Sequence, residues 1–89
     1  MRTPVHTGQF RRDIRRAKWQ GKNISKLREV LTMLIQAEPL PPRFKDHPLR
    51  GEWRGWRKLH IEPDWLLLYK FDGNDLILAR AGSHADLFR

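Results

Sequence analysis

One almost continuous apolar segment, residues 65–71, most restricts how this chain can fold. It reads Trp-Leu-Leu-Leu-Tyr-Lys-Phe, with Lys70 as its one charged residue. A short apolar run of this kind is typical of a central strand that is covered on both faces. Turn-forming residues stand on each side of it, Glu-Pro-Asp at 62–64 and Asp-Gly-Asn-Asp at 72–75. The sequence therefore predicts a central strand with a neighbouring strand before it and another after it.

The flanking segments complete this meander of three strands. Residues 57–61 form the strand before the first turn, and residues 76–81 form the strand after the second. Residues 3–6 are suited to a further short strand at the start of the chain. The proline-containing residues 40–51, with His47 among them, are interpreted as a connecting loop.

The first half of the chain has the hydrophobic period of two helices. The first helix follows Thr7, which is suited to an N-cap, and ends near Gly21. The second starts near Asn23 or Ser25 and is stopped by the prolines that begin at Pro39. Because the link between them is short, we expect an antiparallel helical hairpin. The buried stripes of the two helices are Phe10, Ile14 and Ala17, then Ile24, Leu27, Leu31, Leu34 and Ile35.

This order of elements predicts an α+β fold, with residues 1–89 as a single domain. The N-terminal helical hairpin is expected on one face of a small antiparallel sheet, which leaves the other face free for a ligand. No apolar run approaches the roughly 18 residues of a membrane helix, and the N-terminus does not resemble a signal peptide. The chain has no cysteine, which excludes disulfides and thiolate metal sites. We therefore expect a cytoplasmic protein with no membrane contact.

Positive charge is concentrated in the first half of the chain. Residues 1–45 contain 11 Lys and Arg against 3 Asp and Glu, whereas residues 46–89 contain 7 of each kind. Arg11 and Arg15, on the first helix, are candidates for contacts with RNA phosphates. The same charge would also suit an acidic protein partner, or simply a solvated helix face.

The second half of the chain contains the groups that RNA cleavage requires. The 2′-hydroxyl beside the scissile phosphate is an internal nucleophile, so cleavage needs a base, an acid and a cation for the phosphorane. Imidazoles and carboxylates can serve as the acid–base pair, and an arginine suits the phosphate. The candidates are His47, His60, Asp64, Arg80 and His84.

Each candidate also has a structural interpretation. Asp64 follows a proline in a turn, where aspartate commonly makes local hydrogen bonds. Arg80 could pair with an acidic neighbour, and a lone histidine such as His6 usually has a surface or packing role. A zinc site of three histidines and a carboxylate is disfavoured because the spacing is irregular. The expectation is a mechanism without a metal or another cofactor.

Four short blocks of sequence occur together between residues 7 and 88. They are residues 45–49 (Lys-Asp-His-Pro-Leu) with Gly51, residues 60–65 (His-Ile-Glu-Pro-Asp-Trp), residues 67–70 (Leu-Leu-Tyr-Lys), and residues 82–84 (Gly-Ser-His) with 87–88 (Leu-Phe). In this order they resemble the YafQ-type branch of the RelE superfamily of bacterial type II toxins. Several blocks in order are much harder to match by chance than one short motif.

The resemblance implies a RelE/microbial-ribonuclease-like fold and an endoribonuclease that cuts messenger RNA in the ribosomal A site. Its partners would be a 70S ribosome with bound mRNA and a cognate antitoxin protein. By position, the resemblance implies acid–base or phosphate-contacting roles for four residues, His47, His60, Asp64 and His84. It implies that Arg80 is the cation that stabilises the transition state. Trp65 and Phe88 fall at positions tied to substrate placement.

Two functions from different classes follow. The first is a ribosome-dependent mRNA endonuclease that uses metal-free acid–base catalysis, in which His84 is the first choice of proton donor. The alternative is a non-catalytic basic module that binds ribosomal RNA or an acidic protein. The alternative would need the N-terminal arginines and not the histidines.

Overall fold

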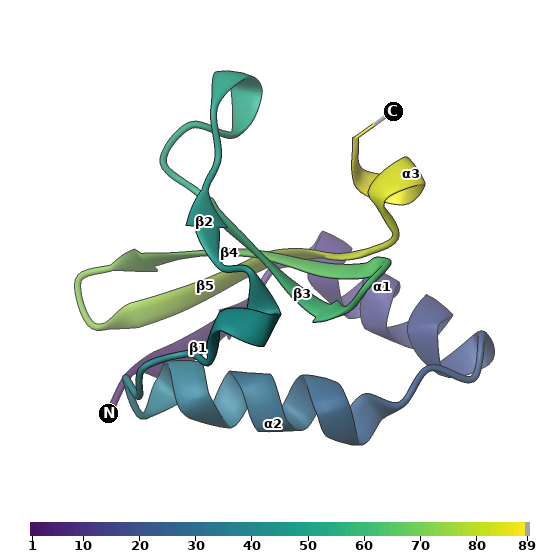
Figure 1. Ribbon diagram of the computed structural model, residues 1–89, viewed down its shortest axis with the longest axis horizontal. Helices are drawn as coiled ribbons and strands as arrows, with labels where there is room; N and C mark the ends of the chain where they lie inside the picture. Colours follow the sequence, from purple (N-terminus) through teal and green to yellow (C-terminus); the bar gives the residue numbers. More distant parts are fainter. Residues whose placement is uncertain (89) are drawn as a thin grey trace.

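The computed structural model describes residues 1–88 and has a five-stranded sheet with two long helices on one side (Figure 1). The strand order is β1-β5-β4-β3-β2. The strands are β1 (Thr3–His6), β2 (His47–Pro48), β3 (Arg57–Glu62), β4 (Trp65–Asp72) and β5 (Asp75–Gly82). Strand β4 lies at the centre of the sheet, as its apolar sequence predicts, and the α+β fold class is confirmed.

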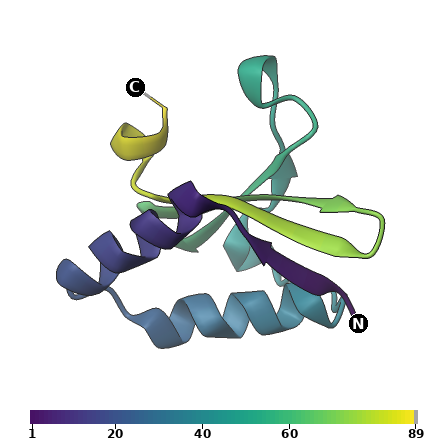
Figure 2. The same cartoon turned by 180° about the vertical axis from the view of Figure 1, so that it is seen from behind.

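The two N-terminal helices are α1 (Gly8–Trp19) and α2 (Ile24–Ile35). The Thr7 hydroxyl accepts a hydrogen bond from the Phe10 amide at 3.0 Å, so Thr7 is the predicted N-cap of α1. Gly21 has a φ of 74°, a left-handed conformation that favours glycine and allows the chain to turn back into α2. Figure 2 shows the resulting hairpin of helices on one side of the sheet.

The main core lies between these helices and the sheet. Side chains alternate along each strand, so every second residue of β3 and β4 points toward the helices. In β5 an irregularity in the pairing with β4 breaks this alternation between Leu78 and Ala81. The fully or largely buried residues of this core are Phe10, Ala17, Leu27, Val30, Leu34, Phe44, Leu59, Ile61, Trp65, Leu67, Tyr69, Leu76, Leu78 and Ala81. The core fixes which residues of the meander point to the opposite face.

The sheet differs from the expected antiparallel sheet at both edges. β1 pairs with β5 in parallel, from Thr3 opposite Asp75 to His6 opposite Leu78, so the sheet is mixed. The long connection through both helices allows this direction, whereas a tight hairpin would not. At the other edge, part of the expected loop 40–51 forms β2, where His47 pairs with Lys58. A strand of two residues has no periodicity of its own, so only its pairing defines it.

The second face of the sheet is not bare, contrary to the expectation. A 3₁₀ turn, η2 (Gly51–Trp53), and the C-terminal helix α3 (His84–Leu87) both rise from this side, away from α2 (Figure 1). They pack on a small apolar cluster, separate from the main core. The cluster contains Leu66, Leu68, Ala79 and Leu87, with Leu49, Trp53, Trp56 and Phe88 partly buried against it.

Candidate active site

The register of the sheet places several predicted site residues in one row across the face opposite α1 and α2. His47 is opposite Lys58, Lys58 is opposite Leu68, and Leu68 is opposite Arg80. Directly opposed residues point to the same face of a sheet, and Leu68 belongs to the apolar cluster on the face opposite α1 and α2. Neighbouring partners lie about 5 Å apart, so Lys58 is about 10 Å and His47 about 15 Å from Arg80 along this row.

His60 belongs to the next row on the same face. It is opposite Leu66, and Leu66 is opposite Gly82, the last residue of β5. The chain leaves β5 at this point and enters α3 through Ser83, whose hydroxyl accepts from the Asp86 amide at 3.1 Å. This cap brings the start of α3, and with it His84, to the end of the row that contains His60.

Asp64, in the turn that follows His60, contacts α3. Its carboxylate accepts a hydrogen bond from the His84 backbone amide at 3.0 Å. The nearest polar contact of His60 is the carbonyl oxygen of Pro63, 3.1 Å from Nδ1. Asp64 therefore links the β3–β4 turn to the helix that carries His84, which makes a positioning role as natural as an acid–base role.

Two histidines share the same hydrogen-bonding arrangement. Nδ1 of His47 lies 2.9 Å from the carbonyl oxygen of Lys45, as Nδ1 of His60 lies against the carbonyl of Pro63. A carbonyl oxygen can only accept, so Nδ1 carries the hydrogen in both rings. The lone pair of each neutral imidazole is then on Nε2. Both rings can therefore accept a proton at Nε2 without losing the contact that orients them.

The segment that holds His47 is anchored by its neighbour Asp46. The Asp46 carboxylate accepts from Arg57 Nη2 at 3.0 Å and from the hydroxyl of Tyr69. The hydrogen bond that Arg57 donates to Asp46 is the main cause of the raised pKa of its guanidinium. Burial, together with the bond to Asp46, raises the pKa of the Tyr69 hydroxyl. This group fixes β2 against β3 although β2 contains only two residues.

Phe88 extends the site above the sheet. Its ring centroid lies 5.1 Å from that of His84, and Lys58 Nζ lies 5.3 Å from the Phe88 centroid. The side chain is partly buried against the smaller apolar cluster. Phe88 is thus placed between an imidazole and a cation, and part of its ring surface is open to a nucleotide base.

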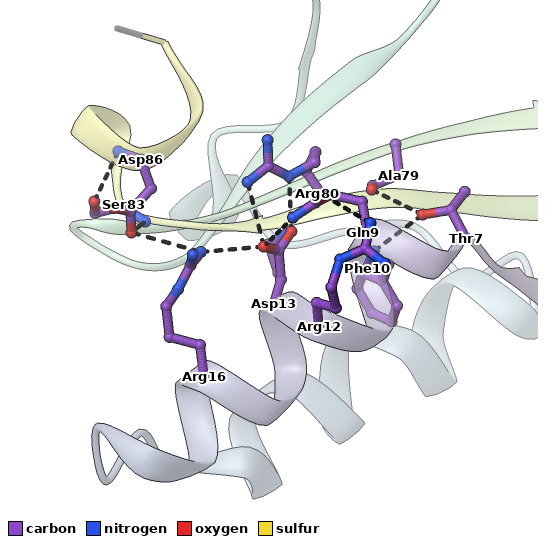
Figure 3. Close-up of polar contacts among 11 residues, drawn as sticks. Thr7, Gln9, Phe10, Arg12, Asp13, Arg16, Ala79, Arg80, Ser83 and Asp86 are labelled. Atoms are coloured by element: carbon purple, nitrogen blue, oxygen red, sulfur yellow. Dashed lines mark hydrogen bonds and ion pairs between the residues drawn. The ribbon is translucent and has the colours of Figure 1, made fainter.

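Arg80 pairs with an acidic neighbour, which is the structural alternative that the sequence analysis gives for this residue. Its Nε donates to Asp13 Oδ2 at 2.8 Å and its Nη2 donates to Asp13 Oδ1 at 3.2 Å (Figure 3). A guanidinium has five N–H groups, so this pairing leaves donors on Nη1 and Nη2 for a phosphate. The pairing therefore does not remove Arg80 from the candidate site.

Three other predicted substrate-binding residues lie outside this row. Trp65 is 1% exposed and packs in the main core, where it anchors the strand that follows Asp64. Arg11 and Arg15 are exposed on α1, on the helix-covered side of the sheet. Any RNA that they contact would be a different segment from the one on the histidine face.

Lys58 and Asp13 are site residues that the sequence analysis missed. Lys58 shares the face of His60 because the two are separated by two positions in β3, so the alternation of the strand already contained this signal. Asp13 falls within the apolar stripe of α1, three positions after Phe10 and four before Ala17. Among the described residues, no group of three or more histidine or acidic side chains is arranged to hold a metal ion. No helix in residues 1–88 is long and apolar enough to cross a membrane.

Comparison with known proteins is consistent with this geometry. Residues 2–89 match the family described as bacterial toxin of type II toxin-antitoxin system, YafQ. The mRNA interferase toxin YafQ of Escherichia coli strain K12 is 44% identical over 84 residues, which cover 93% of this chain and 91% of that toxin. The toxin chain in the crystal structure of the E. coli DinJ-YafQ complex has a TM-score of 0.92 and 42% identity, with 100% of both chains covered. A metal-bound toxin from Helicobacter pylori has a TM-score of 0.93 and 37% identity, covering 99% of this chain and 100% of that one.

Proposed function

Because this chain belongs to the YafQ family of bacterial type II toxins, we propose that it cuts messenger RNA in the ribosomal A site and so stops translation. Endoribonuclease activity follows from membership of the family. Ribosome dependence, the A-site position and the mechanism are the proposed parts. Action on translating ribosomes implies a cytoplasmic location.

The single observation that supports this proposal best is the row formed by His47, Lys58 and Arg80 across one face of the sheet. His60 and the start of α3, with His84, lie beside this row. An imidazole acid–base pair and two cations are the set that cleavage at a 2′-hydroxyl needs. Leu66 and Leu68, which are buried beneath this face, form an apolar floor of low dielectric constant. Electrostatic interactions between the cations and a phosphate are stronger in such surroundings.

The proposed chemistry uses no metal. A base, Nε2 of His47 or His60, takes the proton of the 2′-hydroxyl, whose oxygen attacks the adjacent phosphorus. Arg80, with Lys58, stabilises the charge of the phosphorane. The bond from phosphorus to the 5′-oxygen breaks, and His84 donates a proton to that leaving oxygen. The products are a 2′,3′-cyclic phosphate and a free 5′-hydroxyl.

We also propose a cognate antitoxin as the partner that blocks this activity. The E. coli relative is found in a complex with DinJ, and the excess of positive charge in residues 1–45 of this chain suits an acidic segment. Co-expression with an acidic protein encoded next to this chain should restore growth. Growth inhibition that no neighbouring protein relieves would contradict this part of the proposal.

Primer extension on a defined message in a purified translation system tests the central proposal. Wild type should produce cuts only when ribosomes are present, and His84→Ala should produce none. Ribosome binding should be unchanged in His84→Ala, because the side chain is exposed at the start of α3. Cutting of the same message without ribosomes would show a free ribonuclease.

The basic-module alternative is supported by one observation, the exposure of Arg11 and Arg15 away from the histidine face. It predicts that translation stops while the message stays intact. In that case Arg11→Ala with Arg15→Ala would relieve the block, and His84→Ala would not. Intact message in the primer-extension experiment would therefore favour the module over the enzyme.

A further inference from the structure

Asp13 is the one charged residue buried among residues 1–88, with 1% of its surface exposed. It lies on the core-facing stripe of α1, between Phe10 and Ala17, where an apolar side chain would be expected. Figure 3 shows its carboxylate directed toward β5 and the guanidinium of Arg80. Its position calls for an explanation because a buried carboxylate is costly unless its oxygens are fully paired.

Both oxygens of Asp13 are held by donors from two elements. Oδ2 accepts from Arg80 Nε at 2.8 Å and from the backbone amide of Ala81 at 3.0 Å. Oδ1 accepts from Arg80 Nη2 at 3.2 Å, from Arg16 Nη2 at 3.1 Å and from Gln9 Nε2 at 3.3 Å. The carboxylate is therefore fixed from both sides, and the two contacts from Arg80 fix the plane of its guanidinium.

The other arginine of this group is fixed in turn. Arg16 Nη2 lies 3.8 Å from Asp86 Oδ2, and that oxygen accepts from the Ser83 amide at 3.2 Å. Gly82 provides the space for this contact, since a Cβ there would lie 3.2 Å from Arg16 Nη2 and 3.3 Å from Asp86 Cβ. Arg16 therefore prevents Asp13 from turning away from Arg80.

We propose that Asp13 is a positioning residue for RNA cleavage, which aims the free N–H groups of Arg80 at the scissile phosphate. Replacing a buried ion pair by apolar side chains is often neutral or stabilising, so stability alone does not account for Asp13. A fixed guanidinium loses no rotamer freedom when the phosphorane forms, which is how preorganised charges lower a barrier. This inference rests on the proposed function, because it assigns Arg80 the role of transition-state cation.

The test uses Asp13→Asn in the full chain, with Asp72→Asn as the matched control. Asp72 is the exposed last residue of β4, so the control makes the same change of charge far from Arg80. In the translation system, Asp13→Asn should lower kcat for mRNA cutting about 100-fold, as expected for a misplaced group, and leave KM for ribosome-bound message nearly unchanged. Asp72→Asn should cut at the wild-type rate.

A double variant separates positioning from an independent effect. If Asp13 acts through Arg80, Asp13→Asn combined with Arg80→Gln should cut no more slowly than Arg80→Gln alone. Losses that multiply in the double variant would overturn the proposal, as would a folded Asp13→Asn that cuts at the wild-type rate. If Asp13→Asn does not fold, Asp13→Glu decides: it keeps the charge but moves the guanidinium, so cutting at the full rate would overturn the proposal.

A measurement of Arg80 itself keeps this inference separate from the proposed function. The Arg80 Nε hydrogen, held by Asp13, should exchange slowly with water in wild type and faster in Asp13→Asn by NMR. Equal exchange in both proteins would overturn the positioning role. If wild type cut no message at all, the proposed function would fail, and the exchange measurement would still test the contact between Asp13 and Arg80.

Discussion

At the scale of residues, the two oriented histidines show which ring atom is available for chemistry. Backbone carbonyls hold Nδ1 of His47 and of His60, so Nε2 is the ring atom left to exchange a proton. The chain supplies these carbonyls locally, from Lys45 and Pro63, within three residues of each ring. An amide side chain can imitate one ring nitrogen and not the other, which gives a way to test this assignment.

We expect His60→Asn to stop cutting without loosening the fold. The asparagine amide can donate to the Pro63 carbonyl in place of Nδ1, but it has no group at the position of Nε2. Loss of a general acid or base should slow cutting by about 10²- to 10⁴-fold in single-turnover measurements. His6→Asn is the control, because His6 is exposed on β1. Cutting by His60→Asn within a few-fold of wild type would remove His60 from the chemistry.

Tyr69 gives a prediction about pH. Burial raises the pKa of its hydroxyl above the ordinary value of 10.0, and the bond to Asp46 adds to the effect. Above pH 10.0 the unfolded chain loses this proton while the folded chain keeps it, so the free energy of unfolding falls as pH rises. From about pH 9 to about pH 11, thermal unfolding of wild type should therefore shift down more than that of Tyr69→Phe. Parallel curves for the two proteins would contradict this.

Single residues also mark where sequence reasoning stops. The histidines, Asp64 and Arg80 were predicted as site residues from their chemistry, and the strand alternation contained the position of Lys58. The partner of Arg80 was not predictable, because Asp13 is 67 positions away and the pair exists only once α1 lies against β5. The contact between Asp64 and the start of α3 depends in the same way on how the last turn folds back.

At the scale of elements, the long periodic segments were predictable and the short ones were not. The helices and the three strands of the meander follow from apolar periodicity and turn residues, and the strand ends lie within one residue of those predicted. The end of α2 was less well predicted, because the helix stops at Ile35, before the prolines that begin at Pro39. β2 and the parallel direction of β1 are set by pairing between distant segments, which no local pattern contains. The last helix begins at His84 because Ser83 is its N-cap.

The cap of α3 is the element that we expect to be most sensitive. Ser83→Ala removes the acceptor for the Asp86 amide and should lower the free energy of unfolding by about 1 kcal/mol. Cutting should fall as well, since fraying of this four-residue helix displaces His84. Ser83→Thr keeps a hydroxyl and should restore both values. Chemical denaturation measures the stability of the three proteins, and primer extension measures their cutting of mRNA. Cutting by Ser83→Ala at the wild-type rate would contradict the prediction.

At the scale of the whole molecule, the proposed function gives separate roles to the two faces of one sheet. The row with His47 lies on the face opposite α1 and α2, and the exposed arginines of α1 lie on the side of the helical hairpin. Figures 1 and 2 show the hairpin of α1 and α2 on one side of the sheet and α3 on the other. Positive charge on one side can attract ribosomal RNA over a long range, while the other side acts on the message at close contact.

This separation predicts different kinetic effects for the two sets of residues. Arg11→Ala with Arg15→Ala should raise KM for ribosomes and weaken its salt dependence, by up to about two in the log–log slope, with kcat unchanged. The pair Arg11→Lys and Arg15→Lys keeps the charge and should behave nearly as wild type. Titration of ribosomes at several salt concentrations measures both quantities. A fall in kcat without a change in KM would place these arginines in the chemistry instead.

The small apolar cluster under α3 and η2 has a consequence for the order in which the molecule loosens. It is separate from the main core and contains four buried residues, whereas the main core contains fourteen. Segments with few buried contacts open at a lower free energy than the whole protein. Amide hydrogens of α3 should therefore exchange through a local opening, whereas those of α2 should exchange only through global unfolding. On warming, mRNA cutting would then stop at a lower temperature than the midpoint of global unfolding.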